Sequence, residues 1–228
     1  MTDNDYKSFI EIGLEDYLKQ RGNGNIYQEG HMFKINSFVG NLSDDQKKIL
    51  KDKIIKKKNE THTQHNDLLH EISIACAFYN KVNFLPETDE KTPDFCSNGI
   101  CVEVKTINNS DIERKRQDEL NKGPYCNISP ALNQKEVEDI KKETIECVGK
   151  KFKDHIGTAK KQLDANGGHI WIVYTIDSPP KFHEKINIEI ENKFDEIIKE
   201  LSLELNKSKI CVRYIYFESL REKIANLK

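Results

Sequence analysis

Residues 92–105 read Thr92-Pro93-Asp94-Phe95-Cys96-Ser97-Asn98-Gly99-Ile100-Cys101-Val102-Glu103-Val104-Lys105. Asn-Gly between two strand-like runs is the strongest short hairpin signal, because a type I′ turn requires a positive φ at both central residues. With residues 98 and 99 in the turn, counting outward pairs Phe95 with Val102 and Asp94 with Glu103. This stretch therefore predicts a β-hairpin whose two arms carry opposed carboxylates.

Three polar side chains of this hairpin are expected on one face. Side chains alternate along a strand with a period of two, so Asp94, Glu103 and Lys105 should point the same way. Directly opposed residues have Cβ atoms roughly 4.5–5.5 Å apart, and like charges placed so are destabilising. Two opposed carboxylates beside a lysine therefore suggest a bound cation, and hard oxygen ligands suit Mg²⁺ or Mn²⁺.

The pattern Pro93-Asp94, eight residues, then Glu103-Val104-Lys105 resembles the PD-(D/E)xK nuclease superfamily, whose fold is called restriction-endonuclease-like. The sequence around the pattern agrees, because a helix that bears an acid precedes the hairpin and a helix and a strand follow it. The resemblance covers approximately residues 66–217. It implies an α/β fold with a restriction-endonuclease-like core, in which helices flank a mixed central sheet in the order α-β-β-β-α-β-α-β.

Hydrophobic periodicity supplies the elements of this order. An apolar stripe at helical spacing predicts an amphipathic helix after residue 66, formed by Leu68, Ile72, Ala75, Cys76 and Tyr79. Residues 169–176 are nearly continuous apolar, as expected of a strand covered on both faces. In the hairpin, Ile100, Val102 and Val104 are expected to face the core. The remaining elements are expected as strands at 82–85 and 210–217 and helices at about 150–164 and 190–205.

The rest of the chain is expected to form two additions to this core. Residues 1–60 predict a mostly helical N-terminal accessory arm, within which Ser43 caps a helix with Gln46 at the capping-box position. Residues 26–39 are ambiguous and could form a hairpin. Residues 61–228 would form the nuclease-like catalytic domain, with a helical or loop insertion at about 107–149.

The resemblance also implies roles for individual residues. Asp94, Glu103 and the backbone carbonyl of Val104 would hold Mg²⁺, and Glu71 would ligate through water or help to hold a second ion. Lys105 would orient the attacking water or stabilise developing charge, because a lysine beside two carboxylates stays protonated. Gln162, on the helix after the hairpin, would point at the metal or the phosphate.

Nucleic-acid binding would need local basic groups, because 36 Lys plus Arg against 38 Asp plus Glu leave a net charge of −2. Runs of basic residues most often form a solvated surface, and this is the competing interpretation of the runs in this chain. Another basic run includes Lys53 and Lys56-Lys57-Lys58. The candidate phosphate contacts are Lys160, Lys150, Lys151 and Lys153 on the second core helix, and Arg114, Lys115 and Arg116 in the insertion.

Cysteine usage and hydropathy indicate a cytoplasmic location. Six cysteines contain no Cys-x-x-Cys, and no secretory signal precedes them, so free thiols are expected. The register does place Cys96 opposite Cys101, so a disulfide is conceivable there. No apolar run approaches the roughly 18 residues of a membrane span.

His70, next to Glu71, is expected at the surface.

Together these features predict a Mg²⁺-dependent nuclease that hydrolyses DNA phosphodiester bonds, with Mn²⁺ as a substitute. The simplest biological role is a restriction or other genome-defence endonuclease. The alternatives are a repair or recombination nuclease for branched or single-stranded DNA, and a non-cleaving DNA-binding module of the same fold. A homodimer would provide two active sites, and the choice between DNA and RNA stays open.

Overall fold

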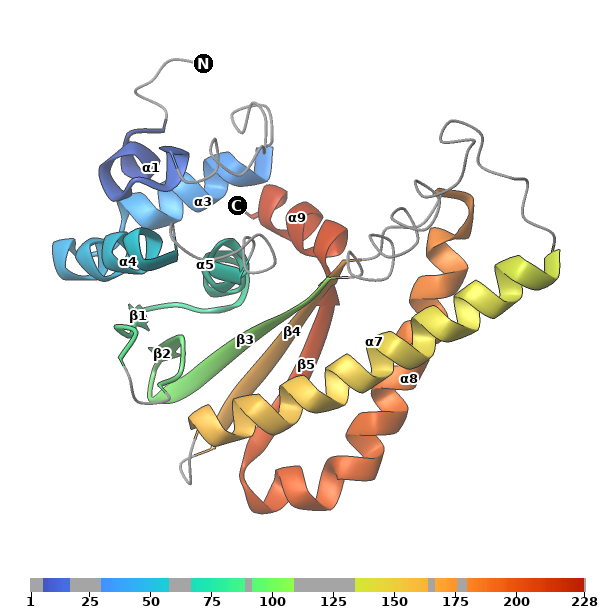
Figure 1. Ribbon diagram of the computed structural model, residues 1–228. Helices are drawn as coiled ribbons and strands as arrows, with labels where there is room; N and C mark the ends of the chain where they lie inside the picture. The colour runs from blue at the N-terminus through green and yellow to red at the C-terminus, as the bar shows by residue number, and fades with distance from the viewer. Residues whose placement is uncertain are drawn as a thin grey trace.

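One mixed sheet of five strands forms the centre of the molecule (Figure 1). The computed structural model describes residues 6–16, 30–57, 67–88, 92–108, 134–163, 167–175 and 180–227. The first three strands are antiparallel neighbours and the last three are parallel. In sheet order they are β1 (Val82–Phe84), β2 (Phe95–Ser97), β3 (Ile100–Asn108), β4 (Gly168–Thr175) and β5 (Ile210–Tyr216). The expected α/β class with a mixed, helix-flanked sheet is confirmed.

Helices cover both faces of this sheet (Figure 1). One face packs against α1 (Lys7–Ile12), α3 (Gly30–Gly40), α4 (Asp44–Lys57), α5 (Asp67–Phe78) and α9 (Phe217–Ala225). The other face packs against α7 (Gln134–Leu163) and α8 (Pro180–Lys207). Side chains of β4 alternate between the two cores, Trp171 and Val173 into the first and Ile170 and Ile172 into the second. The prediction that this strand is covered on both faces is confirmed.

The described N-terminal residues are helical, as expected. Ser43 Oγ accepts a hydrogen bond of 3.4 Å from the Gln46 N–H at the start of α4, so the predicted cap is present. The alternative of a hairpin within 26–39 is wrong, because α3 begins at Gly30. Met32, Ile35 and Val39 recur at steps of three and four and are buried in the same core as the sheet.

The hairpin forms in the predicted register. Asn98 and Gly99 have φ of 51° and 81°, as a type I′ turn requires. The pairs are Phe95 with Val102, Cys96 with Cys101, and Ser97 with Ile100. Val102 and Val104 are buried, but Ile100 is 40% exposed because it adjoins the turn at the end of the hairpin. The expectation that Ile100 faces the core is wrong.

The helices of the second face are longer than the pattern suggested. From α5 onward the order is α-β-β-β-α-β-α-β as expected, and then α9 follows, which was not expected. β3 reaches Asn108, and α7 begins at Gln134, inside the segment assigned to an insertion. α8 begins at Pro180 rather than near residue 190, since proline suits the first turn of a helix. Within the ranges given above, no helix is long and apolar enough to cross a membrane.

Candidate functional site

The candidate site lies just before the first residue of β2, where β3 continues beyond its pairing with β2. The N–H of Asp94 donates to the Val102 carbonyl at 3.0 Å, although Val102 is already the register partner of Phe95. Two residues therefore oppose one, which is the arrangement of a β-bulge. β2 begins at Phe95, so the predicted ladder pair between Asp94 and Glu103 is not formed. A bulge redirects a side chain, and here it redirects that of Asp94.

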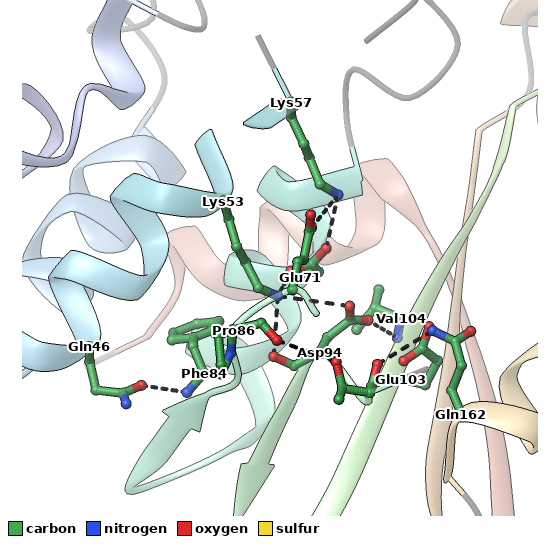
Figure 2. Close-up of polar contacts among 12 residues, drawn as sticks. Gln46, Lys53, Lys57, Glu71, Phe84, Pro86, Asp94, Glu103, Val104 and Gln162 are labelled. Carbon is green, nitrogen blue, oxygen red and sulfur yellow. Dashed lines mark hydrogen bonds and ion pairs between the residues drawn. The ribbon is translucent and has the colours of Figure 1, made fainter. Parts of the chain in front are cut away.

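Asp94 instead binds the edge of β3 through its side chain. Its Oδ2 accepts a hydrogen bond of 2.7 Å from the backbone N–H of Val104 (Figure 2). β2 no longer reaches this part of β3, so the carboxylate occupies the place of a ladder acceptor. The N–H and C=O of one strand residue project to the same side, so the Val104 carbonyl faces this edge as well.

Glu103 lies on the opposite side of β3 from Val102 and Val104, toward α7. Its side chain is 1% exposed, and Lys105 Nζ lies 2.5 Å from its Oε1. Its Oε2 is buried and has no hydrogen-bond partner among the residues that the structure describes. Burial raises the pKa of Glu103, and Lys105 compensates only in part. A buried carboxylate oxygen without a partner is costly, which makes it a candidate ligand for a cation.

Asp94 experiences two neighbouring negative charges. Burial raises its pKa well above the ordinary value, and the carboxylates of Glu71 and Glu103 raise it further. Lys53 and the Val104 N–H act in the opposite direction and do not cancel this effect. Glu71 and Glu103 therefore both act on the charge of Asp94, although not through the predicted ladder pair.

Two lysines of α4 form ion pairs with the acids of the site. Their role was not predicted from the sequence. Lys53 Nζ lies 2.9 Å from Glu71 Oε2 and 4.0 Å from Asp94 Oδ1, and Lys57 Nζ lies 3.4 Å from Glu71 Oε1 (Figure 2). Burial alone would raise the pKa of Glu71, but the two ammonium groups hold it below its ordinary value. A solvated face was the competing interpretation, and it is wrong for Lys53, which is 2% exposed. A sequence signal did exist, because Lys53 shares a helical stripe with Leu50 and Ile54.

The second core helix also reaches this edge. Gln162 Nε2 donates to the Thr92 carbonyl at 3.5 Å, two residues before Asp94, and its Oε1 is buried without a partner among the described residues. His155, on the same helix, was not singled out from the sequence. Burial and the charge of Lys105 lower the pKa of His155, although a hydrogen bond with the Thr106 backbone opposes them. Gln162 and His155 therefore adjoin opposite ends of the Asp94–Lys105 segment.

The candidate phosphate contacts do not gather in one place. Lys153 and Lys160 form ion pairs with Glu200 and Glu204 of α8. Lys151 is half-buried and its charge acts on His155, whereas Lys150 is exposed. Arg114, Lys115 and Arg116 lie outside the described residues.

Two further expectations about this region are wrong. His70 is fully buried, its Nδ1 lies 2.9 Å from Thr106 Oγ1, and burial lowers its pKa to about 3. Cys96 and Cys101 form a disulfide across the hairpin rather than a pair of free thiols. Cys76, Cys147 and Cys211 are free, as expected.

Among the described residues, no three His, Cys, Asp or Glu side chains are arranged to hold a metal ion. Glu71, Asp94 and Glu103 thus do not converge on one point. No protein-family model, curated protein or solved structure matches the chain.

Proposed function

We propose that this chain is a Mg²⁺-dependent nuclease that hydrolyses DNA phosphodiester bonds, with a restriction-endonuclease-like fold. The observation that carries the proposal is Glu103 Oε2, a buried carboxylate oxygen with no partner among the described residues, on the same strand whose Val104 N–H binds Asp94. Isolated buried anions are normally paired or bound to metal. A hard divalent cation would supply the missing partner.

Three oxygen donors would hold such a cation. They are a carboxylate oxygen of Asp94, Oε2 of Glu103 and the backbone carbonyl of Val104, all on β3 or bound at its edge. Mg²⁺ usually takes one or two carboxylates and keeps several waters, so a third carboxylate is unnecessary. When bound, the ion activates water and neutralises charge on the phosphate, and Mn²⁺ substitutes for it.

Lys105 would act on the reacting groups through its charge. Its Nζ is 2.5 Å from Glu103 Oε1, and its side chain is 22% exposed, so it is anchored yet accessible. Its ammonium group would orient the attacking water and stabilise developing charge. Gln162 would keep the segment before Asp94 in place through Thr92. Lys151 would add positive charge on the α7 side of the site.

The simplest biological role is a restriction or genome-defence endonuclease. A direct test incubates the full chain with supercoiled plasmid, linear duplex, branched DNA and single-stranded DNA, each with Mg²⁺ or EDTA. Cleavage of duplex DNA in Mg²⁺ alone is expected. Preferential cleavage of branched or single-stranded DNA would indicate a repair nuclease, and metal-independent binding without cleavage would indicate a non-cleaving module.

A matched pair of variants makes this test specific to the site. Glu103→Gln should abolish cleavage, because it removes the negative charge offered to the ion. Glu143→Gln, at an exposed position of α7, should cleave as the wild type does. Cleavage that survives EDTA or the Glu103→Gln substitution would overturn the proposal.

A further inference from the structure

We propose that Lys53 is a built-in cation that occupies the space between Glu71 and Asp94, so that the site takes one divalent ion instead of two. This inference rests on the proposed nuclease function and specifies how that site is charged. It assigns the ammonium of an N-terminal helix to the active site, and it makes Glu71 the anchor of that ammonium rather than a metal ligand.

The contacts of Lys53 satisfy an ammonium group. Its Nζ donates to Glu71 Oε2 at 2.9 Å and to the Asp94 backbone carbonyl at 3.3 Å, and it lies 4.0 Å from Asp94 Oδ1. Two of the three donors of the ammonium are thus hydrogen-bonded, and the Asp94 carboxylate adds a longer ion pair. The side chain is 2% exposed, so water does not compete for these contacts. Lys53 therefore joins the helical layer to the bulge as a bound cation would.

Both carboxylate oxygens of Glu71 are already paired with an ammonium group. Lys53 lies against its Oε2 and Lys57 against its Oε1, at 2.9 and 3.4 Å. Mg²⁺ requires ligand oxygens at about 2.0–2.1 Å in near-octahedral geometry, which an ammonium in the same space prevents. A second ion at Glu71 would have to displace a buried lysine that also holds the backbone of Asp94.

The charges of the site agree with a single ion. The charges of three carboxylates and three ammonium groups cancel in the metal-free site. The carboxylates are those of Glu71, Asp94 and Glu103. The ammonium groups are those of Lys53, Lys57 and Lys105. One dication leaves an excess of two positive charges, part of which the scissile phosphate can offset. Two dications would leave an excess of four in a buried region, where uncompensated charge is expensive.

The position of Lys53 is a property of the fold. α4 makes two further contacts with β1 and the segment after it, because Gln46 Oε1 accepts the Phe84 N–H and Lys56 Nζ donates to the Glu87 carbonyl at 2.6 Å. Leu50 and Ile54, on either side of Lys53 in the buried stripe, are at most 1% exposed. The helix is thus held on both sides of Lys53, and this packing restricts the ammonium group to its position between Glu71 and Asp94.

Counting bound Mn²⁺ tests the inference. Electron paramagnetic resonance and calorimetric titration of the full chain should give one tightly bound ion in the wild type. Lys53→Met keeps the aliphatic stem but removes the ammonium, so this variant should bind a second ion between Glu71 and Asp94. Lys51→Met, at an exposed position of the same helix, should bind one ion and serves as the control.

Two bound ions in the wild type, or one ion in a folded Lys53→Met variant, would overturn the inference. The wild-type count decides the question even if the variant does not fold, which circular dichroism would reveal. Two ions together with Mg²⁺-dependent cleavage would refute only the role of Lys53. No bound ion and no cleavage would refute the proposed function as well.

Discussion

The carboxylate of Asp94 accepts a hydrogen bond of 2.7 Å from the backbone N–H of Val104, one residue beyond the buried Glu103. This contact links the bulge to the middle of β3. The place of the acid therefore depends on the hairpin, which ties the geometry of the site to the Asn98-Gly99 turn.

Replacing Lys105 should lower the rate of cleavage in a protein that still folds. Lys105→Met removes the ammonium 2.5 Å from Glu103 Oε1, and its side chain is partly exposed. Loss of one such charge-stabilising group typically lowers a rate by about 10²–10³-fold. Lys161→Met, at an exposed position of α7, is the matched control. Mg²⁺-dependent plasmid cleavage within a few-fold of wild type in Lys105→Met would contradict this role.

Asp94→Asn should stabilise the metal-free protein at neutral and alkaline pH. Burial, Glu71 and Glu103 raise the pKa of Asp94 in the folded state, so the wild type loses stability as pH rises from about 4 toward that raised pKa. Asparagine keeps an acceptor for the Val104 N–H and carries no charge. Urea unfolding in EDTA at several pH values should show an advantage of the variant that grows with pH.

The matched control for this comparison is Asp154→Asn, at an exposed position of α7, for which a change within about 0.5 kcal/mol is expected. An Asp94→Asn protein less stable than wild type at pH 8 would show that the site carries no strain from its acids.

The hairpin could be predicted because its determinants are local. Turn residues with positive φ and a side-chain period of two suffice to give the register of β2 and β3. The bulge at Asp94 could not be predicted by counting residues from the turn, because an extra residue shifts the strand pairing without changing the pattern of apolar and polar residues. Pro93 was the available sign, because proline in a sheet is confined to edges, strand starts and bulges.

The contacts of Lys53 depend on tertiary packing and were out of reach of local rules. Glu71 and Asp94 are 18 and 41 residues away along the chain. Lysines in a basic run are normally solvated, and only the shared stripe with Leu50 and Ile54 marked this one as buried. Glu71 was predicted as a site residue from its position before the hairpin. Its two lysine partners could not be predicted in this way.

His31 of α3 should make the fold sensitive to mild acid. Burial lowers the pKa of His31 to about 4, and the charge of Arg221 contributes, whereas Glu218 opposes them. A histidine with a depressed folded pKa contributes stability fully above about pH 6.5 and loses it as pH falls toward 4, by up to about 1.4 kcal/mol per pH unit. The free energy of unfolding of His31→Gln should fall less steeply across this window. Parallel curves for the two proteins would contradict the prediction.

The packing of α7 on α8 should depend on one aromatic pair. Phe152 and Phe194 stack with ring centroids 3.9 Å apart, and both are fully buried. Phe152→Ala should lower the free energy of unfolding by about 3–5 kcal/mol. Leu203→Ala, at a side chain that is 78% exposed, should change it by less than about 0.5 kcal/mol. Similar urea midpoints for the two variants would contradict this packing.

The most direct test of the metal site is a crystal of the protein grown with Mn²⁺ and measured at a wavelength where manganese scatters anomalously. One strong anomalous peak is expected beside β3, within about 2.0–2.3 Å of oxygens from Asp94, Glu103 and the Val104 carbonyl. Saturating Mn²⁺ with no peak at these three residues, or a peak held by other residues, would contradict it.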